Sequence, residues 1–439
     1  MNKFMLTQPK RTLGRNTFTD QKGIGGAAES ETVYNGYFKI FDITTTDSNG
    51  NSQFRVAVAD GKTWNPETQT SGRQWYDAFF YGEKRLTNKS ISYGKSGVLT
   101  PPTPPAKESS DPYATFYVVF WLDVLRGVHP DVFGDDSTPI ANVYVTESLP
   151  VESRRYLYKT IGRLNFYSVK KPATEDTPEV YVARMEVVQE HKDGRIVFNE
   201  PDYYVGYFGL FQLSTNQIVI PGGHDIQLVT PQHRIKVTLP VPTVVQLEAK
   251  PGVYVIYLAI DVLRGISTTA LSAETPVVSA KVALTKMPKN THRWYYVSLG
   301  TVRVVTTTVN NQQQISRLEI TQPVPDTGGA DEFYLETNLY TGQFALFDYE
   351  SNKAWCLGGS TDLPGADDVP EQAVEGVAGR DSTKIYLVAS WDGTNYLAEV
   401  SGSSTTEDAR IYLGEVSANG AVTQDYQSGR AYFGDRYWL

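Results

Sequence analysis

The sequence contains little of the material from which disulfides, metal centres and histidine-based active sites are built. Its 439 residues include a single cysteine, Cys356, and five histidines. One cysteine excludes an internal disulfide framework and any cysteine-based metal cluster. The sequence also lacks a G-x-S-x-G elbow, a P-loop and an H-E-x-x-H motif. We therefore expect no enzyme activity, no catalytic residues, no bound metal and no cofactor.

Long apolar runs are also missing. None approaches the roughly 20 residues that a helix needs to cross a bilayer. The first residues, MNKFMLTQPKRTLGRN, contain no apolar core of a secretory signal. We therefore expect no membrane association and no export by a cleaved signal.

Charge is distributed unevenly along the chain. Residues 1–30 hold five basic side chains against two acidic ones, whereas residues 331–439 hold 18 acidic side chains against 6 basic ones. The stretch between them is close to neutral, because the whole chain carries −9. A body without a basic face cannot neutralise phosphates, so we expect no nucleic-acid partner.

What the sequence does contain favours strands and turns. It holds 28 Tyr, 18 Phe, 36 Gly and 24 Pro. Aromatic residues favour strands, while Gly and Pro favour turns. The composition predicts an all-β fold, and the short apolar segments between turn residues fit a sandwich or a short barrel.

Four sequence landmarks recur three times in the same order, which is the strongest signal in the chain. The first is an aromatic strand at 36–42, 206–212 and 342–348. The second is an apolar strand ending in aspartate, and the third is an aromatic strand with a glycine. The fourth is a strand ending in glutamine. Three sets of residues mark the second, third and fourth landmarks in the three repeats. They are Asp123, Asp261 and Asp392; Gly162, Gly300 and Gly414; and Gln189, Gln322 and Gln424.

The spacing of these landmarks supports duplication. Asp123 and Gly162 are 39 residues apart, and so are Asp261 and Gly300. We therefore divide the chain into an N-terminal arm and three repeats: the arm at 1–32, repeat 1 at 33–200, repeat 2 at 201–330 and repeat 3 at 331–439. The sequence thus predicts three tandem β-sandwich or barrel-like domains behind an extended arm.

Repeat 1 carries an insertion at 64–112 that the other repeats lack. It contains an aromatic cluster that includes Trp64, Trp75 and Tyr76, followed by a proline-rich stretch. The prolines predict an extended surface segment. Two interpretations remain open: a loop that packs its aromatics on its own domain, or a loop that binds a partner or a sugar.

The recurrent aspartates have a structural and a catalytic interpretation. A glycosidase needs two carboxylates facing each other across a groove. Asp123, Asp261 and Asp392 instead occupy the same strand end in separate repeats. We interpret all three as residues that cap a turn.

The arm has neither helical nor strand periodicity. It carries apolar residues at Phe4 and Met5 and basic residues at Lys10, Arg11 and Arg15. One interpretation is a frayed tail. The other, which we favour because of the apolar anchors, is a docking arm that becomes ordered on a partner, with the basic side chains facing an acidic surface.

The order of the landmarks resembles the β-repeat modules of virion structural proteins from tailed bacteriophages and prophages, such as tail-fibre and head-fibre components. The residues that carry the resemblance are RWYYVSLGTV at 293–302 and SRLEITQ at 316–322, with their equivalents in the other repeats. The segment YQSGRAYFGDRYWL at 426–439 also resembles the ends of such proteins. This resemblance implies a structural or adhesive function, assembly as an oligomer, and no active site.

Two hypotheses of function follow. In the first, the chain is a fibre, collar or decoration component of a virion, attached to capsid, portal or tail proteins by its arm and displaying β-domains outward. In the second, it is a receptor-binding adhesin whose exposed aromatics recognise host surface glycans. Exposed Trp and Tyr along a groove would favour the second, and aromatics buried in every repeat would favour the first.

Overall fold

The fold of this computed structural model is all-β, with 54% strand and 4% helix, which confirms the predicted fold class. The structure describes residues 38–434 except 49, 60, 62–63, 66, 69, 72–75, 81–88, 94–96, 107–110, 135–139, 174–177, 191–195, 199–202, 272–275, 324–332, 393–395 and 403–408. The chain divides into two compact units, residues 1–205 and 206–439. Repeats 2 and 3 lie almost entirely in the second unit.

The described elements of the first unit are strands of very different lengths, one short α-helix and one 3-10 helix. They are β1 (Lys39–Asp42), β2 (Thr45–Thr46), β3 (Ser52–Gln53), β4 (Val56–Ala59), β5 (Trp64–Asn65), β6 (Thr70–Ser71), β7 (Tyr76–Phe80), β8 (Lys89–Tyr93), β9 (Gly97–Leu99), β10 (Ala114–Asp123), α2 (Val124–Val128), η1 (Pro130–Val132), β11 (Ala141–Thr146), β12 (Tyr156–Lys171), β13 (Val180–Gln189) and β14 (Ile196–Phe198).

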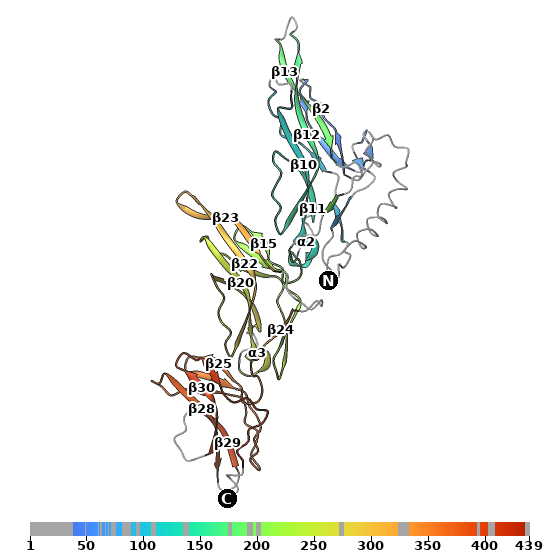
Figure 1. Ribbon diagram of the computed structural model, residues 1–439. Helices are drawn as coiled ribbons and strands as arrows, with labels where there is room; N and C mark the ends of the chain where they lie inside the picture. The colour runs from blue at the N-terminus through green and yellow to red at the C-terminus, as the bar shows by residue number, and fades with distance from the viewer. Residues whose placement is uncertain are drawn as a thin grey trace, which may run out of the picture. The chain divides into compact units, whose positions relative to one another are not determined.

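The first unit is built around the sheet β11-β10-β12-β13, whose long strands lie side by side in Figure 1. Two smaller sheets, β1-β4-β9 and β14-β7-β8, supply the opposite layer. The ring of Phe120 in β10 packs against Phe38, which directly precedes β1, and against Phe198 of β14, with centroid distances of 5.0 Å and 5.9 Å. These buried aromatics form the core of a β-sandwich.

The second unit contains the elements of repeats 2 and 3. They are β15 (Phe211–Ser214), β16 (Gln217–Ile220), β17 (Asp225–Val229), β18 (Arg234–Thr238), β19 (Thr243–Gln246), β20 (Gly252–Asp261), α3 (Val262–Ile266), β21 (Val278–Leu284), β22 (Trp294–Val309), β23 (Gln312–Thr321), β24 (Phe333–Glu336), β25 (Leu346–Glu350), β26 (Lys353–Cys356), β27 (Gln372–Glu375), β28 (Ser382–Trp391), β29 (Tyr396–Ser401), β30 (Ala409–Ser417) and β31 (Val422–Gln424).

Each repeat has a four-stranded antiparallel sheet of the same topology: β11-β10-β12-β13, β21-β20-β22-β23 and β29-β28-β30-β31. Each sheet has the same register shift, where one extra residue of the third-landmark strand precedes the glycine. The paired residues at this point are Val118 with Gly162, Ile256 with Gly300 and Ile385 with Gly414. The three glycines therefore occupy equivalent positions.

The glycines are required because the neighbouring strand comes very close. A Cβ at Gly300 would lie 2.6 Å from the carbonyl oxygen of Thr321, and one at Gly414 would lie 2.1 Å from that of Thr423. Gly414 also has a φ of +155°, which L-residues rarely adopt. A bulge with close backbone approach explains the recurrence of this glycine.

The register corrects one of the sequence equivalences. Ile385 stands at the position of Ile256, and Asp261 lies five residues beyond Ile256. The corresponding residue of repeat 3 is therefore Ser390, and Asp392 lies two residues further on, exposed to solvent. All three segments are apolar strands that end in aspartate, but the DVLRG continuation that follows Asp123 and Asp261 is absent from repeat 3.

The boundary between repeats 2 and 3 also differs from the one placed at 330. Strand β24 follows that boundary but pairs in parallel with β17 of repeat 2. Strand β14, just before repeat 2, pairs in parallel with β7 of repeat 1 in the same way. The segment that leads into each of these next repeats thus completes a sheet of the repeat before it.

Candidate functional site: strand-end ion pairs and aromatic sheet faces

A buried ion pair lies at the end of the second-landmark strand in repeats 1 and 2. Asp123 accepts hydrogen bonds from Nε and a terminal nitrogen of Arg155, the latter at 2.8 Å. Asp261 is bound in the same way by Arg293, at 2.7 Å. Both aspartates are at most 2% exposed. Each arginine directly precedes the residue that pairs with the aspartate, Tyr156 of β12 or Trp294 of β22, so the sheet register brings the two charges together.

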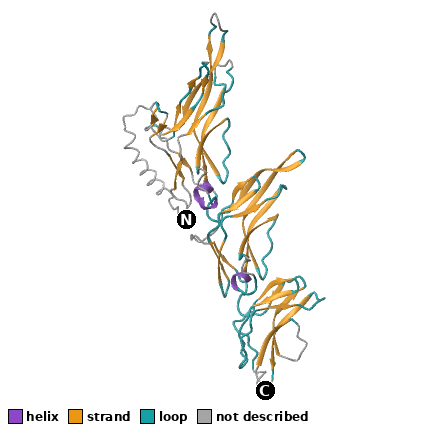
Figure 2. Ribbon diagram, turned by 180° about the vertical axis from the view of Figure 1, so that it is seen from behind, coloured by secondary structure: helices purple, strands orange, loops and turns teal. Residues whose placement is uncertain are grey.

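The same carboxylates begin a short helix. Asp123 accepts from the amide of Arg126 at the start of α2, and Asp261 accepts from the amide of Arg264 at the start of α3. Figure 2 shows the two helices in purple at the ends of their strands. The turn-capping interpretation is therefore confirmed for Asp123 and Asp261, whereas Asp392 does not occupy the equivalent strand position.

This geometry has a chemical consequence for the two aspartates. A carboxylate that is buried, paired with a guanidinium and bonded to a backbone amide accepts hydrogen bonds at both oxygens. It offers no free oxygen to a substrate. The contacts around Asp123 and Asp261 are those of a structural ion pair.

Aromatic side chains gather on the outer face of each four-stranded sheet. Phe116, Val118 and Phe120 of β10 point into the core, so the alternate residue Trp121 points outward. Its ring packs edge-on against Tyr156, with centroids 5.6 Å apart. Both rings are half-buried.

Repeat 2 has the corresponding aromatic group. Trp294 and Tyr296 are stacked with an interplanar angle of 15° and centroids 6.4 Å apart. Tyr257 packs edge-on against Tyr296 at 5.7 Å. Arg293 lies over Trp294, 5.3 Å from the ring centroid, which connects the aromatic group to the ion pair.

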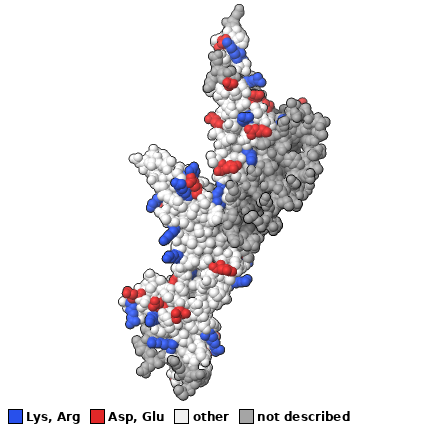
Figure 3. Space-filling model, viewed as in Figure 1, with Lys and Arg blue, Asp and Glu red and all other residues white. Residues whose placement is uncertain are grey.

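Repeat 3 places cations beside its outer aromatics. Tyr386 and Tyr412 lie 5.6 Å apart. Arg410 lies 4.8 Å from the Tyr386 ring, and Lys384 lies 5.9 Å from the Tyr412 ring. The three outer faces thus share aromatic character while their individual residues differ. Figure 3 shows acidic and basic side chains interspersed over the visible face of the second unit.

Repeats 2 and 3 are joined within the second unit by polar contacts. The Tyr349 hydroxyl donates to the carbonyl oxygen of Ala270 at 3.1 Å. Thr269 and Trp355 both donate to the carboxylate of Glu371. Burial raises the pKa of Glu371, but hydrogen bonds from Thr269, Ser267 and Trp355 outweigh burial and lower it below its ordinary value.

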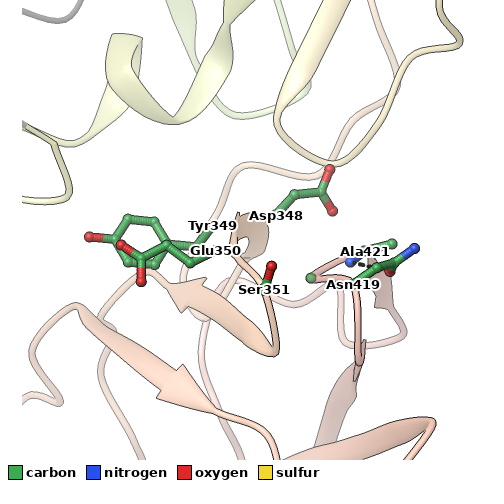
Figure 4. Close-up of a pocket in the computed structure, with 7 residues that line it drawn as sticks. Asp348, Tyr349, Glu350, Ser351, Asn419 and Ala421 are labelled. Carbon is green, nitrogen blue, oxygen red and sulfur yellow. Dashed lines mark hydrogen bonds between the residues drawn. The ribbon is translucent and has the colours of Figure 1, made fainter.

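A small pocket of about 280 Å³ lies at two turns of repeat 3. It is lined by Asp348, Tyr349, Glu350, Ser351, Asn419, Gly420 and Ala421. Figure 4 shows Ser351 between the side chains of Tyr349 and Glu350 and those of Asn419 and Ala421. Asp348 already accepts from the amide of Val422 at 2.9 Å. Of the two carboxylates that line the pocket, that of Asp348 is therefore used to hold the backbone of the neighbouring turn.

The half-buried His292 lies near Asp348 of this pocket. Burial lowers its pKa, and the charge of Asp348 opposes part of that effect. Its Nδ1 is buried and has no hydrogen-bond partner among the described residues. A buried imidazole in this state is neutral near pH 7.

Most of the docking and glycan-contact residues predicted from the sequence lie outside the part of the chain that the structure describes. Phe4, Met5, Lys10, Arg11 and Arg15 of the arm and Trp75 of the insertion are not among the described residues. Trp64 lies in β5 and Tyr76 in β7, but their side chains are likewise outside the description.

Sequence reasoning missed the ion pairs and the outer aromatic faces. A signal for the pairs was present, since an arginine stands 32 residues after each DVLRG aspartate. The aromatics of the third landmark were recognised as part of a strand, but which face of the sheet they occupy depends on the pairing register, which the sequence alone does not give.

No described helix is long and apolar enough to span a membrane. Within the described part of the chain, no group of three or more His, Cys, Asp or Glu side chains is arranged to hold a metal ion. In comparisons with known proteins, no protein-family model and no curated protein matches this chain.

Proposed function

We propose that the chain is a non-enzymatic structural protein of a tailed-bacteriophage virion, a fibre, collar or decoration component. In this proposal the arm at 1–32 attaches it to capsid, portal or tail proteins, the three repeats are displayed outward, and the chain assembles as a homo-oligomer. Neither nucleic acid nor membrane is a partner.

The observation that carries the proposal is that the aspartates repeated in the sequence form structural contacts within the fold. Asp123 and Asp261 are the aspartates whose recurrence suggested chemistry, and both are engaged by an arginine and a helix amide. A repeated ion pair that joins strand, helix and neighbouring strand favours a building module over a catalytic site.

The attachment is tested by deleting residues 2–30 from the gene in the parent phage. We expect the shortened protein to fold and remain soluble but to be missing from purified particles. Circular dichroism of the purified variant is the control for folding. If the shortened protein is incorporated into particles at the normal level, the arm does not mediate attachment, and a β-domain must do so.

A second candidate function is glycan recognition by the outer aromatic faces. The stacked pair Trp294 and Tyr296 supports it, because half-exposed parallel rings offer a surface on which a sugar ring can stack. Binding to a host glycan array, followed by Trp294→Ala, tests it. The matched control is Tyr334→Ala, which removes an exposed ring from β24, a strand of the separate β18-β17-β24 sheet. Loss of binding in the first variant alone supports an adhesin.

A further inference from the structure

In repeats 1 and 2 a parallel strand from a later segment adds to a sheet, and in repeat 3 a later segment forms a single parallel bridge. In repeat 1, β14 pairs with β7 from Ile196 to Phe198. In repeat 2, β24 pairs with β17 over four residue pairs, from Ile226 with Phe333 to Val229 with Glu336. In repeat 3, Thr361 forms a parallel bridge with Ala431.

The contacts of residues 430–434 show how repeat 3 receives its segment. The amide of Ala431 donates to the oxygen of Ser360, and the amide of Asp362 donates to the oxygen of Ala431. The Asp362 carboxylate accepts from the amide of Phe433 at 2.8 Å. The Arg430 guanidinium donates to the oxygen of Thr361 at 2.6 Å. Two side chains thus add to the main-chain pairing: Asp362 from residues 360–363 and Arg430 from the segment that pairs with them.

The segment also contributes alternate side chains to the core. Ala431 is fully buried and Phe433 nearly so, whereas Tyr432 between them is 70% exposed. Both buried residues belong to the hydrophobic core of repeat 3, together with Phe344 and Leu363. This in-out-in pattern is the one by which an added strand is recognised at a sheet edge. It matches β24, where Phe333 is buried and Tyr334 is exposed.

The segment is joined to the rest of repeat 3 by a short exposed stretch. Gln427, Ser428 and Gly429 are exposed, and a Cβ at Gly429 would meet nothing within 4 Å. The Tyr340 hydroxyl donates to the oxygen of Ser428 and holds the start of the segment. Residues 430–434 are therefore held by main-chain bonds, two side-chain contacts and core packing, all of which a separate peptide of the same sequence could also make.

We infer that the edge of repeat 3 from Ser360 to Leu363 is a peptide-binding site for an extended segment that runs parallel to it. The site takes a small residue and an aromatic residue two positions apart. Its ligand is the 429–434 segment of this chain, which binds without needing its covalent connection.

The test uses the chain shortened to end at Tyr426 and a fluorescent peptide of residues 427–434. We expect saturable binding, measured by fluorescence anisotropy, with one peptide per chain. A peptide with Ala431→Glu should bind at least about tenfold more weakly, because a charge would enter a site that has no room and no partner for it. A peptide with Tyr432→Ser should bind within about twofold of the original, because that side chain faces solvent.

Two results would overturn the inference. One is a shortened chain that keeps the native circular dichroism spectrum and does not bind the peptide. The other is equal binding of the original and the Ala431→Glu peptides. If the shortened chain does not fold alone, it is refolded from denaturant with each peptide. Recovery with the original peptide and not with Ala431→Glu supports the site, and no recovery, or equal recovery, contradicts it.

Discussion

The side chain of Gln322 binds the backbone of Leu210, 112 residues earlier in the chain. The amide of Leu210 donates to Oε1 of Gln322 at 2.9 Å, and Nε2 of Gln322 donates to the oxygen of Phe208 at 2.8 Å. Gln189 makes the same two bonds with Ile40 and Phe38 in repeat 1. In repeats 1 and 2 the glutamine of the fourth landmark thereby holds the backbone of the first landmark, which explains why both landmarks recur.

Replacing Gln322 by Leu should destabilise repeat 2. The substitution leaves a buried amide and a buried carbonyl without partners, at a cost of about 1–3 kcal/mol for each group. Urea unfolding measures the change in free energy. Gln313→Leu, on an exposed position of β23, is the control. Equal stability of the two variants would show that the clamp contributes nothing.

Removing one partner of the buried ion pair should have a larger effect. Arg293→Ala leaves Asp261 buried and uncompensated, and we expect a loss of about 3–5 kcal/mol. Arg303→Ala breaks an exposed pair with Glu319 and should cost less than about 1 kcal/mol. Thermal and urea unfolding of both variants provide the comparison. Similar losses in the two would contradict a structural role for the buried pair.

The bulge glycine should tolerate no side chain. Gly414→Ala places a Cβ against the oxygen of Thr423 in a backbone conformation that disfavours L-residues, so we expect a loss of at least about 2 kcal/mol. Gly429→Ala, which introduces the same atom into open space, is the matched control and should unfold like the original protein.

Cys356 should be unreactive until repeat 3 unfolds. Burial raises the pKa of its thiol far above the ordinary value, so almost no thiolate is present in the folded chain at pH 8. Labelling with a thiol reagent should be slow in buffer and complete in denaturant. Because the folded pKa is raised, this group's contribution to stability decreases as pH rises above about 8.5, where the unfolded chain ionises. Rapid labelling of the folded protein would contradict this.

His292 should make the second unit sensitive to acid. Its folded pKa is lowered, so the unfolded chain binds a proton first as pH falls below about 6.5 and the folded state loses stability. We expect His292→Gln to weaken the dependence of urea unfolding on pH between 7.5 and 5.5. An unchanged slope would assign the acid sensitivity to other groups.

The fold class and the equivalence of the three bulge glycines follow from the sequence because strand and turn residues report local geometry. The pairing partner of each strand does not follow from the sequence in this way. The boundary placed at 330 therefore separated β24 from β17, the strand with which it pairs. Parallel pairing between segments far apart in the sequence leaves no local signature. The aspartate of repeat 3 was misplaced for a related reason: a short shared motif outweighed the register that only pairing reveals.

The late arrival of β24 has a consequence for synthesis on the ribosome. Residues 206–322 can emerge and form most of repeat 2, but Ile226 and Leu228 keep an open edge until Phe333–Glu336 leaves the exit tunnel. A nascent chain at that stage carries an unpaired strand edge, the feature that invites association with neighbouring chains. During translation there is therefore a period in which repeat 2 is nearly folded but still has an unpaired strand edge that can associate with other chains.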